Sequence, residues 1–428
     1  MRETSGDGGY SSQRVTAGAL SLVLVIGILV STILLGLVLF YAGTRTLLQQ
    51  HRIQLQVQQN TRSGIAYLLA TPTLPYFQRV DLDLFGSGDD SVVVEKRPWG
   101  IFDLVRARAS KNNFRDSLIG LVGSRFDPSG QVALYIANDD KPVSMVGSSQ
   151  VVGDAYLPTL GIRSAYLGTQ ELPAPTKLVT GRTLPRTTAA APAVPPPLTC
   201  LQQYAALDLS AWLPANSQTL EKLRSVERSF YRPPLVWLQT QPATIRAVTL
   251  SGQILLVSTH KLVIEADAHL DNVVVMAPVV VIKAGFHGRL QVFARDTVEI
   301  GADSQLAYPS AVCAFSTTGV AKVFLAERSQ VHGVVIAANP PGSAATSLVR
   351  MHQSSRVVGQ LHVEGVLENC GQVTGTVRCR QLLYSTIASF YENYLVDATI
   401  DREQLPADYL TTPRLNPQAG LGILAWLP

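Results

Sequence analysis

The sequence begins with an apolar segment long enough to cross a membrane. No charged residue occurs between Arg14 and Arg45, and most residues there are Leu, Val, Ile, Ala or Gly. A membrane-spanning helix needs roughly 20 apolar residues, whereas a secretory signal has an apolar core of about 7–15 residues followed by a small-residue cleavage site. The sequence therefore predicts one transmembrane helix, with residues 15–42 contacting lipid and residues 1–14 forming a cytoplasmic tail.

A second helical pattern continues directly from the apolar segment. Residues 44–70 are rich in Gln, Leu and Arg and contain no Pro before Pro72 and Pro75. Their apolar residues fall roughly on one stripe of a helix, at Leu48, Leu55, Ile65 and Leu69. We predict one continuous helix over residues 15–70, roughly 80 Å long at about 1.5 Å per residue. The alternative is a break near Gly43.

Composition places the rest of the chain among folded exported proteins. Charged residues make up 15% of the sequence and apolar residues 46%, which favours a packed core over disorder. The formal net charge is +4 and no basic cluster stands out, so nucleic-acid-binding classes are set aside. Arginines flank both ends of the apolar segment almost equally. We therefore orient it by composition, with the anchor in the inner membrane and the later domains periplasmic or extracellular.

Four cysteines occur, at Cys200, Cys313, Cys370 and Cys379. An even number in an exported domain permits two disulfides. The short interval between Cys370 and Cys379 predicts a bridge that closes a hairpin-sized loop, with free buried thiols as the alternative. Zinc-site spacings, phosphate-binding loops and dinucleotide fingerprints are absent from the sequence, so we predict no metal, no cofactor and no small-molecule substrate.

The region between the helix and the C-terminal half divides in two. Residues 73–185 contain short apolar runs separated by turn sequences, which predicts a small β domain with strands at 91–96, 100–106, 116–122, 131–137 and 143–146. Residues 186–232 are predicted to contain a Pro-rich linker and, over residues 217–230, a short helix.

An internal repeat fills residues 233–381. Five segments align, and each begins with an apolar residue, at Ile264, Ile282, Ile300, Leu325 and Met351. One repeat of this kind cannot bury its apolar face alone, but repeats that stack on one another share one core. The repeat predicts a C-terminal parallel β-helix or similar solenoid in a mainly β protein; the alternative is an antiparallel sandwich. Residues 382–428 are predicted to form a helical cap, with the helix over 382–396, and a tail.

Polar residues recur at fixed positions of the repeat. His269 and His287 occupy equivalent positions, and Gln305, Gln330 and Arg356 continue the same column. The column is either a metal or acidic-glycan site or a solvent-facing surface. We interpret it as a solvent-facing surface because core residues alternate with it.

Asp267 and Asp303 also occupy equivalent positions, two repeats apart. Their spacing is near that of the carboxylate pair of an inverting glycosidase. Both lie in Ala-Asp turn steps, however, where Asp favours turn geometry. We therefore predict no catalytic residues and no enzymatic activity.

The N-terminus resembles that of minor type IV pilins and pseudopilins. The resemblance rests on the run from Gln13 through Gly18 and on the long Gln-rich helix that reaches Asn60. In that family a polar leader ends in Gly, and the helix first anchors the protein and later packs in a fibre core. The resemblance implies cleavage by prepilin peptidase after Gly18, leaving Ala19 first. The family usually has Glu at the fifth mature position, where this sequence has Val23.

The repeat region is similar to the short-rung β-helices of bactofilin-like and other solenoid proteins. The overall layout is similar to uncharacterised exported proteins of the Bacteroidetes type. These resemblances imply a membrane-anchored structural or interaction protein, a pilin-like component of a cell-surface or secretion assembly that contacts other pilin-like subunits. The alternatives are a membrane-tethered carbohydrate-active or glycan-binding β-helix protein, and a cytoplasm-facing scaffold that polymerises through its β-helix ends.

Overall fold

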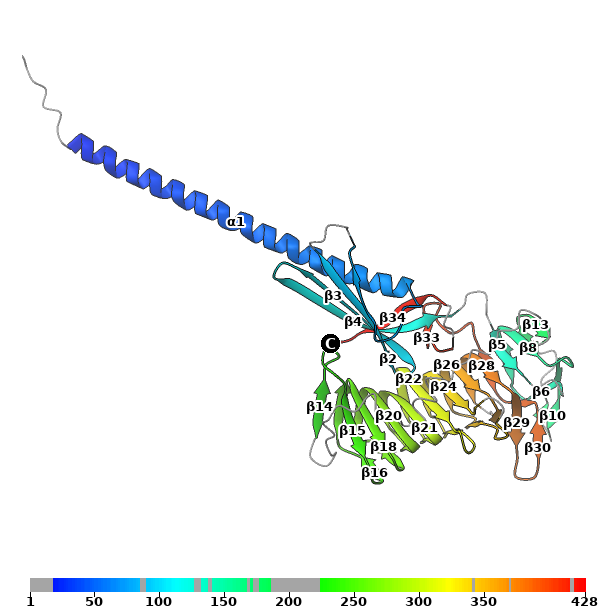
Figure 1. Cartoon of the computed structure of the whole chain (residues 1–428). Helices are drawn as coiled ribbons and strands as arrows, with labels where there is room; N and C mark the ends of the chain where they lie inside the picture. Colours follow the sequence, from blue (N-terminus) through cyan, green and yellow to red (C-terminus); the bar gives the residue numbers. More distant parts are fainter. Residues whose placement is uncertain are drawn as a thin grey trace, which may run out of the picture.

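The computed structural model describes residues 18–84, 90–126, 132–137, 141–167, 170–171, 177–185, 224–340, 343–368, 371–415 and 419–428. These residues are mainly β, with one long helix that projects away from the strands (Figure 1). The predicted cytoplasmic tail, residues 1–14, lies outside the described residues, as do residues 15–17 of the predicted span.

The apolar and Gln-rich segments form a single helix, α1 (Gly18–Ala70), of 53 residues. The predicted continuous rod is confirmed for the described residues, and the alternative break is wrong because Gly43 lies inside α1. Hydroxyl groups in the apolar part bond back to carbonyls one turn earlier, Thr32 to Ile28 and Thr46 to Ala42. These bonds satisfy the hydroxyls without interrupting the helix.

An antiparallel sheet lies against the C-terminal half of α1 (Figure 1). It contains β1 (Arg79–Leu82), β2 (Ser91–Trp99), β3 (Phe102–Lys111) and β4 (Phe114–Arg125) in consecutive order. Two strands from the C-terminal region, β33 (Leu410–Thr411) and β34 (Leu421–Trp426), also pair with β4. The predicted strands at 91–96, 100–106 and 116–122 overlap this sheet.

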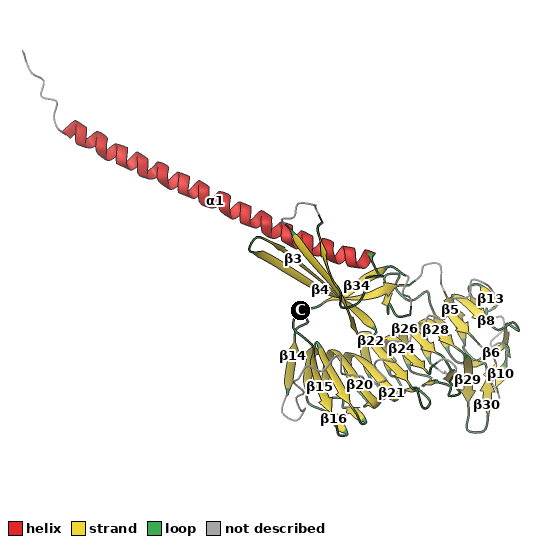
Figure 2. Cartoon of the chain, in the orientation of Figure 1, coloured by secondary structure: helices red, strands yellow, loops and turns green. Residues whose placement is uncertain are grey.

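Parallel strands, stacked side by side, make up most of the remaining structure (Figure 2). They pair into three ladders. The first contains β14 (Ser225–Arg228), β17 (Thr249–Gly252) and the N-terminal parts of β20 (His269–Ile282), β21 (His287–Ile300), β22 (Gln305–Phe315), β24 (Gln330–Ala338), β26 (Arg356–Val363) and β28 (Gln372–Cys379). The second contains β15 (Leu235–Gln239), β18 (Ile254–Ser258) and later parts of the same long strands. The third contains β16 (Ala243–Ile245), β19 (Leu262–Ile264), the ends of β20 and β21, β23 (Lys322–Leu325), β25 (Leu348–Met351), β27 (Val366–Glu368) and β29 (Gln381–Ser385).

The register of the third ladder reproduces the sequence repeat. Ile264 pairs with Ile282, which pairs with Ile300. Ile300 in turn pairs with Leu325, and Leu325 with Met351. The residues that open the five aligned segments therefore stack directly on one another. The alternative of an antiparallel sandwich is wrong for these strands, because all of these pairings are parallel.

Segments from both sides of the repeat complete the far end of the stack. β5 (Val132–Ile136) and β32 (Thr399–Asp401) pair in parallel with β28. Five more strands follow, namely β7 (Gln150–Val152), β8 (Asp154–Leu157), β12 (Val179–Thr180), β13 (Thr183–Pro185) and β30 (Phe390–Glu392), which pairs with β29. Two smaller sheets contain β6 (Val143–Val146), β9 (Ile162–Ser164) and β31 (Tyr394–Val396), and β10 (Tyr166–Leu167) with β11 (Gln170–Glu171).

Three predictions need correction. Residues 73–185 do not form one β domain, because 79–125 build the antiparallel sheet and 132–185 join the far end of the stack. The predicted helix over 382–396 is wrong, because these residues contain β29, β30 and β31. They are rich in aromatic and β-branched residues, which favour strands, and Asn393 has a positive φ of 57°. The predicted helix over 217–230 lies partly outside the described residues, and Ser225–Arg228 is a strand.

The second ladder is apolar on both faces. Val275 and Val292 point into the stack and join its central core. Val274, Met276 and Phe293 point outward and pack against the antiparallel sheet in a second core. The unbroken apolar run of β20 follows from this arrangement, because alternate side chains fill two different cores.

Candidate functional site

The N-terminal half of α1 is an apolar surface without a partner among the described residues. Most of the large apolar side chains that are exposed belong to it; Leu20 is 75% exposed, Phe40 73% and Tyr41 70%. Keeping such a side chain in water instead of burying it costs about 1.5–3 kcal/mol. This part of α1 is long and apolar enough to cross a membrane. We refer to residues 18–48 as the apolar half-helix.

The C-terminal half of α1 is fixed to the antiparallel sheet. Val57 and Leu68 are buried together with Val92 and Ala107 of the sheet. Gly64 lies at the closest approach, where an added Cβ would be 2.9 Å from Val92 Cγ1 and 3.0 Å from Ala107 Cβ. The absence of a side chain here lets the helix backbone lie directly on the strands.

The predicted apolar stripe is correct only where the sheet covers the helix. Ile65 is buried and Leu69 packs against the same cluster. Leu48 and Leu55 are 59% and 45% exposed, so the stripe is wrong for these two residues. The sheet reaches α1 only from about Ile53 onward, which leaves Leu48 beyond its edge, whereas Leu55 lies on a side of the helix that the sheet does not cover.

A buried carboxylate fixes the point where α1 leaves the sheet. Asp90 Oδ2 accepts hydrogen bonds from Gln56 Nε2 at 2.8 Å and from Asn60 Nδ2 at 3.0 Å. Lys111 Nζ lies 2.9 Å from Asp90 Oδ1 and also donates to Gln56 Oε1 at 3.2 Å. The Lys111 hydrogen bond, together with those of the two amides, lowers the pKa of Asp90 below its ordinary value of 3.8.

This lowered pKa predicts an acid-sensitive attachment of α1. The stabilisation from Asp90 is fully present above the unfolded-state pKa, near 4, and is lost as pH falls through the lower folded-state pKa. We expect Asp90→Asn to lower the unfolding free energy at neutral pH by about 1–3 kcal/mol and to flatten its decline below pH about 4. Denaturant unfolding of the full chain in detergent, at a series of pH values, measures both. Parallel acid profiles for the variant and the unmodified chain would contradict the assignment.

A second buried charge cluster lies beyond the end of α1. Asp103, fully buried, accepts from Arg414 Nη2 at 2.8 Å and from Tyr76 Oη at 3.2 Å, and Lys96 Nζ lies 3.6 Å away. Lys96 Nζ also donates to Pro72 O at 2.7 Å. Burial raises the pKa of Tyr76 to about 12. The cluster ties the chain after α1, the sheet and the C-terminal segment together.

One side chain joins the antiparallel sheet to the parallel stack. Gln291 of β21 is buried and accepts from Ile101 N at 2.9 Å through Oε1, and its Nε2 donates to Trp99 O at 3.0 Å. Gly100, between these two residues, has φ +63°, and a Cβ there would lie 2.0 Å from Gln291 Oε1. The helix, sheet and stack therefore form a connected unit.

The pilin-type positions lie at the start of α1. Gly18 is the first described residue, and its carbonyl accepts from Ser21 Oγ at 3.0 Å. Val23, where the pilin family usually has Glu, is 68% exposed on the apolar half-helix. Cleavage between Gly18 and Ala19 stays a prediction.

The predicted disulfide involves one described residue. Cys379 is a free thiol on β28, buried in the central core, which does not fit the predicted bridge. Burial raises the pKa of this thiol to about 12. Its partner Cys370 lies outside the described residues, as does Cys200.

The polar column follows the first ladder. Gln305 pairs in register with Gln330, and Gln330 with Arg356. His287 pairs with Gln305, and His269 begins β20 with an exposed side chain. Within the described residues, no group of three or more His, Cys, Asp or Glu side chains is placed to hold a metal ion.

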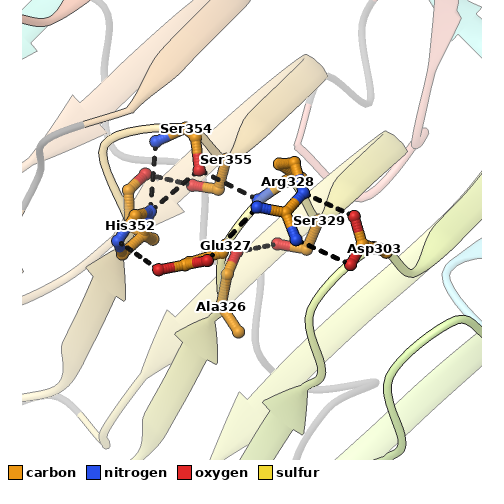
Figure 3. A network of polar contacts seen from close by, with 8 residues as sticks. All are labelled: Asp303, Ala326, Glu327, Arg328, Ser329, His352, Ser354 and Ser355. Atoms are coloured by element: carbon orange, nitrogen blue, oxygen red, sulfur yellow. Dashed lines mark hydrogen bonds and ion pairs between the residues drawn. The ribbon is translucent and has the colours of Figure 1, made fainter.

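The two repeat aspartates have different surroundings. Asp303 forms a two-point ion pair with Arg328, with Nε to Oδ1 at 2.6 Å and Nη2 to Oδ2 at 2.9 Å (Figure 3). Figure 3 also shows the neighbouring pair of Glu327 and His352, whose nearest atoms are 3.5 Å apart. The Arg328 hydrogen bond lowers the pKa of Asp303. Asp267 is exposed, and the structure does not join it to Asp303 in a carboxylate pair.

Sequence reasoning missed the residues that hold α1 in place. The sequence alone predicts Asp90 to be a turn residue and Asp103 to be a strand residue. Their partners lie far away in the chain; Arg414 is 311 positions from Asp103. A single sequence offers no signal for such pairs. The amide side chains of Gln56 and Asn60, facing a sheet from an otherwise apolar helix face, were the available hint.

Comparison with known proteins adds little to this geometry. No protein-family model matches the sequence, and no curated protein matches it. Among solved structures, one similar chain is the competence-associated pilin ComZ from Thermus thermophilus, with 10% identity over 88% of this chain and 96% of that chain. The TM-score of 0.21 is too low to establish a shared fold. The structure itself shows a mainly β protein with one N-terminal apolar helix that is able to span a membrane.

Proposed function

We propose that this chain is a pilin-like structural subunit, held in the inner membrane by the apolar half-helix, with its folded part on the periplasmic or extracellular side. The observation that carries the proposal is the division of α1 into two halves with opposite surroundings. The first half exposes Leu20, Phe40 and their neighbours, and the second half is buried on the sheet. A helix that only tethers a protein to a membrane does not need to be packed on the sheet. A subunit that holds its folded part in a fixed position relative to a membrane or fibre does need this packing.

The exposed surface requires an apolar partner. Lipid satisfies this requirement before assembly, and the half-helices of other pilin-like subunits satisfy it afterwards. The N-terminal resemblance supports this sequence of events and implies that Ala19 becomes the first residue. Val23 adds no carboxylate to the apolar surface, so the half-helix enters lipid without a charged side chain before Arg45.

We also propose that the parallel strands from β14 onward form a parallel β-helix, the part displayed outside the membrane. Three parallel ladders around one inward-facing core support this assignment. We propose a structural and not a catalytic role for it. Asp303 is engaged by Arg328, which does not favour the glycan-active alternative.

Protease treatment of intact and opened cells tests the proposal. We expect the chain to fractionate with the inner membrane and its folded part to be cleaved once the outer barrier is opened, with the cytoplasm still sealed. N-terminal sequencing of the recovered protein is expected to begin at Ala19. A folded part protected in the cytoplasm would overturn the orientation, and an intact Met1 would reduce α1 to a plain signal anchor.

A further inference from the structure

The helix carries positive charge at the end of the apolar half-helix and beyond it, and it has no acidic residue of its own to balance this charge. α1 contains no Asp or Glu, and its arginines are Arg45, Arg52 and Arg62. All three are exposed. None of them forms an ion pair with another residue of the described ranges. Arg45 lies at the border of the apolar stretch, and Arg52 follows about 10 Å further along the axis at about 1.5 Å per residue.

The β3–β4 hairpin points back along α1 toward the apolar half-helix (Figure 1). Its turn residues, Asn112 and Asn113, are exposed. The contact of Lys111 Nζ with Gln56 Oε1 fixes the level of the turn on the helix. Gln56 lies about 12 Å beyond Leu48, the end of the apolar half-helix. The hairpin turn is therefore the part of the sheet nearest to a membrane that contains this half-helix.

Two more unpaired arginines lie on this hairpin. Arg108 and Arg115 are exposed and form no ion pair with a described residue. They lie on the sheet face away from α1, because the alternating residues Ala107 and Ala109 are buried against the helix. Burial lowers the pKa of the neighbouring Arg106, and the charge of Arg108 lowers it further. Ala107 lies against Gly64, so Arg108 is close to the level of Arg62 on α1, whereas Arg115 lies nearer the turn.

We propose that Arg45, Arg52 and Arg115 form a basic collar that binds the phosphates of anionic phospholipid headgroups on the side of the membrane where the folded part lies. The inference rests on the proposed membrane anchoring of α1. Arg45 and Arg52 lie on α1 at and just past the end of the half-helix, and Arg115 lies near the turn of the hairpin that points back along α1 (Figure 1). The guanidinium fork matches a phosphate in two-point geometry.

The distances agree with this role. The headgroup layer adds about 5–8 Å to each side of the hydrocarbon core, and charge acts over a Debye length of about 8 Å at physiological salt. The apolar half-helix is roughly 46 Å long, longer than a core of about 30 Å, so its depth and tilt are not set by length alone. Headgroup binding by the collar selects the depth at which Leu48 meets the membrane border.

Arg62 supplies a matched control on the same helix. It is exposed like Arg52 and forms no ion pair with a described residue, but it lies about 15 Å further from the membrane. A nucleic-acid footprint is the competing interpretation of unpaired arginines. It is less favoured because the whole chain has a net charge of only +4, and because the collar adjoins a membrane-spanning segment.

The test uses the full chain in lipid nanodiscs of phosphatidylcholine alone or with added phosphatidylglycerol, each with the same amount of headgroup-nitroxide lipid. A fluorophore on Asn113→Cys reports contact of the hairpin turn with headgroups, and the unmodified chain treated with the same label sets the background. We expect stronger quenching with phosphatidylglycerol, reversed by added salt. Arg115→Gln is expected to lower the hairpin–headgroup contact constant about fivefold, and Arg62→Gln and Arg108→Gln are expected to leave it unchanged.

Two results would overturn the collar: equal quenching in both lipid mixtures, or an equal loss with Arg62→Gln. Salt-sensitive binding of duplex DNA by the same nanodiscs, without lipid-dependent quenching, would also overturn it in favour of a nucleic-acid surface. Failure of the chain to enter nanodiscs at all is a different outcome, because it contradicts the proposed anchoring and removes the basis of the collar.

Discussion

Replacing Asp103 with Asn is expected to lower the unfolding free energy of the folded part by about 3–5 kcal/mol. The reason is that Arg414 and Lys96 would then lie beside a neutral amide, with side chains only 16% and 6% exposed. A buried cation without its counter-charge is far less stable than a paired one. Denaturant unfolding of the full chain in detergent, followed by intrinsic tryptophan fluorescence, measures the loss.

Asp303→Asn is the matched control, because it removes a similar Asp–Arg pair at the surface. Asp303 and Arg328 are 53% and 59% exposed, and surface pairs contribute about 0–1 kcal/mol. Adding Arg414→Met to Asp103→Asn is expected to recover part of the loss, because it removes one of the unpaired cations. Equal, small effects of Asp103→Asn and Asp303→Asn would contradict the role of the buried cluster.

The second large effect is expected at Gly359, where Gly359→Ala should destabilise the stack by about 2–6 kcal/mol. Gly359 has φ +136°, and an added Cβ would lie 2.0 Å from Gly333 O and 2.2 Å from Tyr409 Oη. Backbone strain of about 1–3 kcal/mol and overpacking of about 1–3 kcal/mol therefore add. Gly359 pairs with Gly333 on one side and Gly375 on the other, so the carbonyl that an added Cβ would meet belongs to the backbone of a paired strand.

Gly285→Ala is the control that separates the cost of backbone strain from the cost of steric crowding. Gly285 has φ +77°, but the only atom near its added Cβ is Ala266 Cβ at 3.9 Å. Its substitution is expected to cost only the backbone strain, about 1 kcal/mol. Thermal unfolding followed by circular dichroism compares the two variants, and a Gly359→Ala transition no lower than that of Gly285→Ala would show that the corner tolerates a side chain.

The parts predicted well from sequence depend on short-range periodicity. α1 follows from an uninterrupted helical pattern, and the stacking of Ile282 on Ile300 follows from a repeat. The three glycines that pair in register with positive φ, Gly333, Gly359 and Gly375, had a signal as well, since each stands two positions after a Val. That signal was missed because the alignment used the turn segments instead.

The parts that escaped prediction depend on long-range pairing. No local sequence feature distinguishes residues 79–125 from residues 132–157, because both ranges have the pattern of short strands and turns. The two ranges nevertheless join different sheets. Which sheet a strand joins is decided by partners such as Val377 and Leu410, which lie more than half the chain away. The same holds for Asp103 with Arg414.

The pairing of Leu134 with Val377 has a consequence for the order of events during synthesis. β5 leaves the ribosome long before β28, so although β8 can pair with one edge of β5 early, its other edge has no ladder partner until most of the chain has emerged. Contacts of such large sequence separation form slowly, and unpaired strand edges associate with one another meanwhile. The interval between the emergence of β5 and that of β28 is therefore when a nascent chain is most prone to aggregate. A holding chaperone would act most usefully in that interval.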